Sequence, residues 1–370
     1  MGHVQRRGPG KWRARWRGPD GKEVSQAFTR RTDAEQRLAT VKTDMSRGSY
    51  VDPKAGRVPT GVWAARWLEA QRHLKPSTRA RYDGIVSKHI IPRWGAIPLA
   101  KITHADVAGW VASLDGAPAS VRYVHRVLHL LLDLAVRDGR IASNPATGVR
   151  LPRAARPAKR ALTHDDLNRL ADAAGDSRTL VLLLGYVGLR WSEAAALRVG
   201  QVDLLRRRLT IAEAVTEVRG ALVWGIPKSH AHRVVPLARF LVDDLAVLVA
   251  GKGANDLVFT TATGATVRNL NWRRDVFDPA VTSVGLDGLV PHELRHTAAS
   301  LAIQSGASVK SVQLLLGHAS ATTTLDVYSH WFGDDLDRLA DRLDTAAGEA
   351  RAASAERGRS TVRQIGSAGV

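Results

Sequence analysis

The sequence predicts a multidomain α+β protein: a small amino-terminal β-sheet plus helix, an all-helical middle domain, and a mainly helical third domain with a small antiparallel sheet. The chain of 370 residues exceeds the length of one ordinary domain. Apolar residues alternate with period two near the amino terminus and recur at helical spacing after residue 58. Strand-like runs return only within residues 208–235. We therefore expect domains at 1–57, 58–150 and 160–345, a linker at 151–159 and a flexible tail at 346–370.

The composition indicates a globular and strongly basic protein. Hydrophobic residues make up 44% of the chain and charged residues 24%, a balance that excludes wholesale disorder. The 54 Lys and Arg exceed the 35 Asp and Glu by 19 charges, which creates a field that attracts nucleic acid before other partners. The absence of Cys excludes disulfides, cysteine nucleophiles and zinc sites built on thiolates.

No targeting or membrane segment is expected. The basic amino terminus is not followed by an apolar region, and no run approaches the roughly 18 apolar residues of a membrane span. We therefore expect a cytoplasmic protein with no membrane partner.

The first 55 residues predict a sheet with one helix and carry 13 Lys and Arg against six Asp and Glu. Basic and apolar residues alternate over Lys11–Arg17, which places Arg13, Arg15 and Arg17 on one face of a strand. A turn at residues 19–21 leads into a second strand over 22–28. Thr32 then opens a capping box, for a helix that ends near Gly48. A merely solvated strand face remains an alternative for the three arginines.

Residues 58–150 predict four helices around a core. The second helix follows Pro76 and ends near Pro92, and the third begins after Thr103. Apolar residues at helical spacing over residues 121–135 form the stripe of the fourth helix. The tryptophans are predicted as core residues rather than as platforms for stacked bases.

The third domain combines helices with a strand-rich middle. An extended basic linker ends near Lys159, and Thr163 caps the next helix. Strands are expected over residues 208–211, 214–218, 221–224 and 233–235, with Arg219-Gly220 in the turn of a hairpin. The rest of the domain is predicted to be helical.

One short motif suggests a metal site, which we do not expect. The sequence His292-Glu293-Leu294-Arg295-His296 satisfies the H-E-x-x-H zinc pattern. Arg295, however, would place a permanent cation beside both imidazoles, where a dication would have to bind. No third ligand follows at a metalloprotease spacing. The prediction is therefore no metal and no other cofactor.

Five separated segments together indicate a different chemistry. They are Gly188-Leu189-Arg190-Trp191-Ser192-Glu193, Pro227-Lys228-Ser229, His292-x-x-Arg295-His296, Leu316-Gly317-His318, and the late Tyr328. This ordered set closely resembles the tyrosine recombinases, specifically the phage-type integrases. Residues 1–57 resemble the arm-type DNA-binding domain of such integrases, 58–150 their core-binding domain and 160–345 their catalytic domain.

The resemblance implies a site-specific recombinase with a 3′-phosphotyrosyl intermediate and no need for metal or ATP. Tyr328 would attack the scissile phosphate, and Arg190 and Arg295 would hold its non-bridging oxygens with planar forks. Lys228 would protonate the leaving 5′-oxygen, and His292 would exchange the tyrosine proton.

The remaining residues of the set take supporting roles in this resemblance. His318 would hydrogen-bond a phosphate oxygen, Glu193 would orient Arg190, and His296 would give structural support. Each residue alone has a simpler explanation: a surface ion pair for Arg190 with Glu193, a solvated loop for Lys228, a helix end for His318 or a core position for Tyr328.

The resemblance also implies partners. They are double-stranded DNA attachment sites of core and arm types, a homotetramer on DNA, a host DNA-bending protein and a directionality factor. Integration of phage or mobile-element DNA is the expected setting. A resolvase, a type IB topoisomerase and a catalytically inactive DNA-binding or architectural protein of the same fold remain alternatives.

Overall fold

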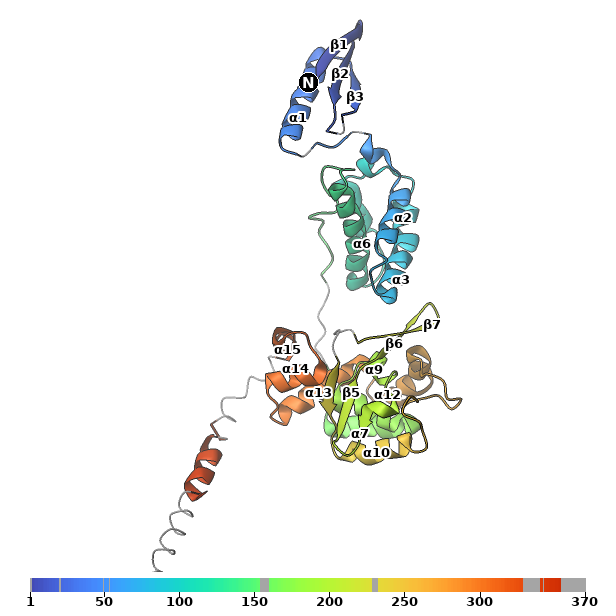
Figure 1. The fold of residues 1–370 in the computed structure, drawn as a ribbon, viewed down its shortest axis with the longest axis vertical. Helices are drawn as coiled ribbons and strands as arrows, with labels where there is room; N and C mark the ends of the chain where they lie inside the picture. The colour runs from blue at the N-terminus through green and yellow to red at the C-terminus, as the bar shows by residue number, and fades with distance from the viewer. Residues whose placement is uncertain are drawn as a thin grey trace, which may run out of the picture. The chain divides into compact units, whose positions relative to one another are not determined.

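The computed structural model describes residues 2–19, 21–48, 50–52, 54–153, 160–227, 232–328, 340–341 and 343–353 of the chain. The chain divides into two compact units, Met1–Pro157 and Ala158–Val370, whose elements are drawn in Figure 1. Small antiparallel sheets accompany many helices, so the predicted multidomain α+β class is confirmed. In the described part of the chain, no helix has both the length and the apolar character needed to cross a bilayer.

A three-stranded antiparallel sheet with one helix packed on it forms the amino-terminal region. Its elements are β1 (His3–Gly8), β2 (Lys11–Arg17), β3 (Glu23–Phe28) and α1 (Arg31–Ser46). The alternation along β2 buries Ala14 and Trp16 against Val41 of α1. The strands at 11–17 and in the second predicted segment are confirmed, whereas the polar β1 was not predicted.

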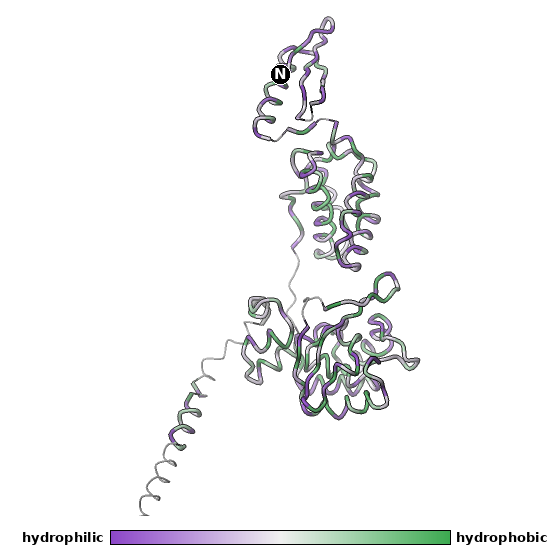
Figure 2. Tube along the Cα trace, viewed as in Figure 1, coloured by the Kyte–Doolittle hydropathy of each residue, from purple (hydrophilic) through white to green (hydrophobic). Residues whose placement is uncertain are grey.

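The middle region is all-helical, as predicted. Its elements are η1 (Ala55–Arg57), α2 (Thr60–Ala70), α3 (Pro76–Ile85), the π-helix η2 (Val86–Ile90), α4 (Ile91–Trp94), η3 (Leu99–Lys101), α5 (His104–Ala112) and α6 (Pro118–Arg137). Hydrophobic positions recur along α6 (Figure 2) and form the centre of the core. Trp63 and Trp67 of α2 are 4% and 2% exposed, and Trp63 Nε1 donates to Leu131 O at 3.0 Å. These tryptophans are core residues.

One predicted helix boundary is wrong. Arg30, not Thr32, is the N-cap of α1: its backbone is extended and no side chain caps the helix. The second predicted helix ends at Trp94, close to the predicted end near Pro92. Pro92 has no N–H to donate, and it follows the wider turn of η2, in which Ile91 N–H bonds Val86 O. The predicted helix starts at Thr103 and Thr163 are confirmed, and each carries a capping box.

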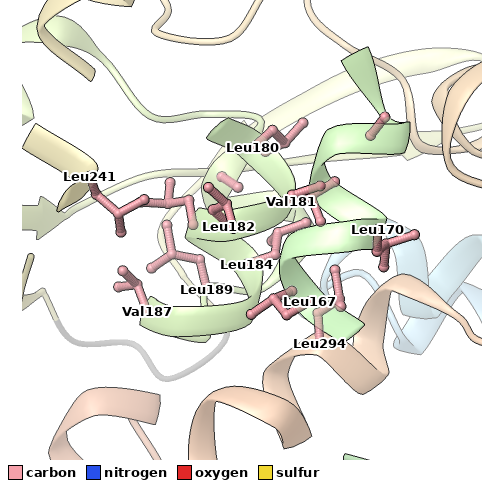
Figure 3. Packing of buried hydrophobic residues seen from close by; sticks show 14 of the residues in the cluster. Leu167, Leu170, Leu180, Val181, Leu182, Leu184, Val187, Leu189, Leu241 and Leu294 are labelled. Carbon is pink, nitrogen blue, oxygen red and sulfur yellow. The ribbon is translucent and has the colours of Figure 1, made fainter. Parts of the chain in front are cut away.

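The third region packs its helices around the buried helix α8. Its helical elements are α7 (His164–Ala173), η4 (Gly175–Ser177), α8 (Arg178–Val187), α9 (Trp191–Ala194), η5 (Val199–Gln201), α10 (Phe240–Val249), α11 (Asn269–Trp272), the π-helix η6 (Arg273–Phe277), α12 (Asp278–Ser283), α13 (Pro291–Gln304), α14 (Val309–Leu316) and α15 (Ala321–Tyr328). Figure 3 shows Leu184 of α8 beside Leu167 of α7 and Leu294 of α13. This core fixes the ends of α8 and α13, where the candidate site lies.

Two small antiparallel sheets complete this region. Their strands are β4 (Val202–Asp203), β5 (Arg208–Ile211), β6 (Ala214–Val218), β7 (Ala221–Gly225) and β8 (Arg233–Pro236). One sheet has the order β4-β5-β8, and β6 pairs with β7. Arg219 and Gly220 have φ of 51° and 82°, the left-handed pair that the tight hairpin turn requires. The predicted strands and turn are confirmed.

Parts of the linker and of the tail lie outside the described residues. These are residues 154–159 of the predicted linker and 354–370 of the predicted tail. Residues 346–353 are helical and exposed.

Candidate functional site

A sharp turn between α8 and α9 positions Arg190. Gly188 ends α8 in the left-handed conformation with φ of 69°, and the following Leu189 is buried. A Cβ at Gly188 would lie 2.6 Å from Leu316 Cδ2 and 3.0 Å from Ala298 Cβ. Only glycine therefore allows the turn to approach α13 and α14 this closely. Arg190 follows this turn and is the N-cap residue of α9. Its side chain is 22% exposed.

The Glu193 carboxylate binds two arginines and is fully buried. Arg190 donates to it from the backbone N–H at 3.0 Å and from Nη1 at 2.8 Å. Arg233 donates from Nη1 at 3.0 Å and from Nη2 at 2.7 Å. Burial alone would raise the pKa of Glu193, but the hydrogen bonds and charge of Arg233, with those of Arg190, lower this pKa to about 2. Glu193 is therefore ionised throughout the physiological pH range.

This carboxylate makes the stability of the domain depend on pH. The pKa of Glu193 is lowered from 4.5 to about 2, so its contribution is present above pH ~4.5 and is lost as the pH falls toward 2. The corresponding loss in the free energy of unfolding is about 3 kcal/mol. We expect Glu193→Gln to flatten this pH dependence. Urea titrations at pH 6, 4 and 3, followed by hydrogen exchange of peptides from α8 and α9, measure it.

Asp275→Asn is the matched control for this experiment. Asp275 pairs with Arg274 at 2.6 Å at the surface, where screening leaves an ion pair little effect on stability. Equal pH slopes in the wild type and Glu193→Gln would contradict the assignment.

Arg295 connects the same turn with the end of α14. Its guanidinium is 4% exposed and donates from Nη1 to Gly188 O and from Nη2 to Leu316 O. On the same helix, His292 is exposed and His296 is half-buried, with ring centroids 5.5 Å apart. The H-E-x-x-H pattern thus carries a buried cation at its fourth position. Among the described residues, no group of three or more acidic, His or Cys side chains is placed to hold a metal ion.

His318 lies immediately after the left-handed end of α14. Its Nδ1 is 3.0 Å from the hydroxyl of the buried Thr324 on α15. Burial lowers the pKa of His318 to about 4, with further lowering by the charges of Arg295, Arg190, His296 and Arg233. The ring is therefore neutral at pH 7, and a hydrogen bond from the Thr324 hydroxyl to Nδ1 would leave its N–H on Nε2.

Two residues of the predicted set are described incompletely or not at all. Tyr328 is the last residue of α15, one turn after Thr324 and so on the same side of the helix. Its side chain lies outside the described part of the structure, as does all of Lys228. The structure thus brings Arg190, Glu193, Arg295 and His318 together, close to the helix that ends in Tyr328.

The arginines of β2 lie on the sheet face opposite the buried Ala14 and Trp16. Arg15 is paired with Glu23 of β3 at 3.0 Å, and Arg13 is half-buried while Arg17 is exposed. In the register, Arg13 lies opposite Gln5 of β1. Apart from Ala27 of β3, this face is polar along all three strands.

Arg233 and Thr324 were not predicted as site residues. Arg233 had a detectable signal, because it lies two residues before Val235, the buried residue of β8. Residues two apart point to the same face of a strand, so Arg233 shares the buried face of Val235. A charged side chain on a buried face needs a partner of opposite charge. Thr324 gave no such signal, because its role depends on how α15 packs beside His318.

Comparisons with known proteins agree on one family. Residues 160–333 match the model of the phage integrase family, and residues 61–114 match the phage integrase N-terminal SAM-like domain. The putative prophage phiRv2 integrase of Mycobacterium tuberculosis (strain CDC 1551 / Oshkosh) is 28% identical over 350 residues, which cover 89% of this chain and 91% of the relative.

Solved structures share the fold at lower identity. The Tn1549 transposon integrase in complex with transposon right end DNA has a TM-score of 0.68 at 19% identity, covering 78% of this chain and 100% of that chain. A lambda integrase tetramer bound to a Holliday junction gives 0.57 at 20% identity, with 86% and 96% covered. At such identities the likeness concerns the fold alone.

Proposed function

This chain belongs to the phage integrase family of tyrosine recombinases, and we propose that Arg190, Lys228, His292, Arg295, His318 and Tyr328 carry its chemistry. The protein is a site-specific DNA recombinase that breaks and rejoins DNA through a 3′-phosphotyrosyl intermediate. In our proposal it integrates phage or mobile-element DNA into the nucleoid of a bacterial host cell.

One observation carries the assignment of the site. Two guanidinium groups, of Arg190 and Arg233, bind a single carboxylate, and that of Arg295 is held by the same turn and by the end of α14. A neutral histidine lies beside them, near the helix that ends in Tyr328. The net positive charge suits the extra negative charge of a pentacovalent phosphorane. Planar forks on Arg190 and Arg295 match the non-bridging oxygens of a phosphodiester.

Strand cleavage is a direct displacement at phosphorus. Tyr328 Oη attacks the scissile phosphorus and passes its proton to His292. The bond from phosphorus to the 5′-oxygen breaks, and Lys228 gives this oxygen a proton, which leaves a free 5′-hydroxyl. His318 donates its N–H to a phosphate oxygen while Glu193 orients Arg190, and His296 supports the site.

No metal or ATP enters this proposed sequence. The arginine charges take the place of a dication at the phosphate. The phosphotyrosyl ester conserves the free energy of the broken bond, so the 5′-hydroxyl of a second strand can reverse the reaction.

Covalent capture tests this function. The protein is incubated in chelator, without nucleotide, with fragmented genomic DNA from its own source; it is then denatured, and the attached fragments are sequenced. We expect fragments joined through a 3′ end, with ends that converge on one crossover site. Salt-sensitive binding without any adduct would contradict the recombinase and favour an architectural protein.

We propose three DNA-binding parts and a tetrameric assembly. Residues 1–57 bind arm-type sites, 58–150 and 160–345 bind the core site, 151–159 connect them, and 346–370 form a flexible tail. The lambda relative has been seen as a tetramer on a Holliday junction, which supports a homotetramer here. A host DNA-bending protein and a directionality factor complete the proposed partners.

The polar face of the amino-terminal sheet gives a prediction for arm binding. Replacing Arg13, Arg15 and Arg17 with Gln is expected to reduce the slope of log affinity against log salt by about 0.9 for each lost phosphate contact. Binding titrations on duplexes that flank the captured crossover site measure it. The control replaces Arg31 and Arg37, which lie on α1; an equal loss in both variants would contradict the assigned face.

A further inference from the structure

Resting on the function proposed above, we propose that Arg233 is a positioning residue that holds the Glu193 carboxylate and the end of α14, and thereby aims Arg190 and His318 at the phosphate. Arg233 is the first residue of β8. Its side chain connects β8 with Glu193 of α9 and with the end of α14, segments that are distant in the sequence.

The contacts of Arg233 reach all three segments. Its Nη1 and Nη2 donate to the two oxygens of Glu193 at 3.0 and 2.7 Å, and its Nε lies 3.4 Å from Leu315 O. Its side chain is 10% exposed, against 22% for Arg190. Arg233 is thus the inner of the two arginines, and Arg190 is the one that reaches solvent.

Packing at Gly317 adds a steric contact to this arrangement. Gly317 ends α14 in the left-handed conformation with φ of 63°, and a Cβ there would lie 2.8 Å from Arg233 Cδ. Arg233 therefore packs directly under the turn from which His318 projects. A change in the Arg233 side chain is expected to shift this turn.

The charge of Arg233 is as important as its shape. Without it, the buried Glu193 would pair with Arg190 alone and would cancel the charge that Arg190 offers to the phosphate. With Arg233 present, the group of three keeps one net positive charge. The fork of an arginine can engage both carboxylate oxygens at once, which lysine cannot do.

Arg233 also follows Lys228 closely in the sequence. Lys228 precedes Arg233 by five residues. The strand that follows the Lys228 loop is therefore fixed to the carboxylate that holds Arg190.

The test compares single-turnover cleavage with DNA affinity. At saturating DNA, Arg233→Gln is expected to lower the cleavage rate by about 10²-fold, the scale of a misplacement near 1 Å, while Kd changes less than threefold. Arg208→Lys is the control, because Arg208 is exposed on β5, across from β8 in the same sheet. An unchanged cleavage rate in Arg233→Gln would overturn the proposal.

A double-mutant cycle separates positioning from general destabilisation. If Arg233 acts through Arg190, its replacement costs much less in an Arg190→Lys background. Equal losses in both backgrounds would overturn the proposal. If Arg233→Gln fails to fold, Arg233→Lys is used in its place. Arg233→Lys keeps the charge without the planar fork, and we expect its cleavage rate to fall by about tenfold. A cleavage rate equal to that of the wild type would overturn the proposal.

The experiments distinguish a failure of this inference from a failure of the proposed function. Absence of an adduct with the wild-type protein contradicts the recombinase itself. Wild-type adducts together with full activity of the Arg233 variants contradict only the positioning role.

Discussion

Tyr328→Phe is expected to abolish covalent DNA capture while DNA affinity stays within about threefold of the wild type. Phe keeps the ring but lacks the hydroxyl that would form the phosphoester. The covalent intermediate therefore cannot form. The phosphotyrosyl adduct, measured by retention of labelled DNA after denaturation, should fall below detection. The α15 backbone should be undisturbed, because the substitution removes only one hydroxyl from a residue of this helix.

Tyr186→Phe is the matched control for this experiment. Only Tyr186 and Tyr328 occur after residue 160, and there are five Tyr in the whole chain. The Tyr186 hydroxyl is 2.8 Å from His164 Nδ1, and burial raises the pKa of this phenol. Its loss should weaken one hydrogen bond and leave the adduct intact. Adducts from Tyr328→Phe, with none from Tyr186→Phe, would transfer the nucleophile to Tyr186.

Arg295→Lys is expected to lower the cleavage rate by about 10³–10⁵-fold, the range for arginines that stabilise a transferring phosphoryl group. Lys keeps the charge but cannot hold two carbonyls and a phosphate oxygen with one planar group. Arg295 is almost fully buried and binds Gly188 O and Leu316 O. Single-turnover cleavage of a core-site duplex measures the loss.

Part of this loss in cleavage rate will come from the altered packing of the site rather than from the missing phosphate contact. Removing the fork leaves buried carbonyls without donors, at a cost of about 1–3 kcal/mol, so thermal unfolding is measured in parallel. The control is Arg274→Lys, at an exposed position beside Asp275. A cleavage rate within tenfold of the wild type would contradict a role for Arg295 at the phosphate.

Local patterns predicted much of the fold. Alternation identified the central strand of the first sheet, and capping chemistry located the helices that begin after Thr103 and Thr163. These signals are local because the interacting groups lie within a few residues. The β1 strand was missed because its order comes from pairing with β2 rather than from its own sequence.

The candidate site was predictable where spacing alone brings residues together. Arg190 and Glu193 are three residues apart, and their predicted pairing is present. The second partner of Glu193 was not predictable in this way, because Arg233 is 40 residues away in sequence. Whether an arginine is solvated or buried on a carboxylate depends on the packing of the whole domain.

The contact between Arg295 and Gly188 O joins residues 107 positions apart, and this has a consequence during protein synthesis. A nascent chain that has emerged only as far as α12 holds the Arg190 turn without the helix that fixes it. Contacts this distant form only after almost the entire third domain is available. If Arg190 and Arg295 hold the phosphate as proposed, we expect a partial chain that ends before α13 to lack an assembled site and therefore to leave DNA uncut.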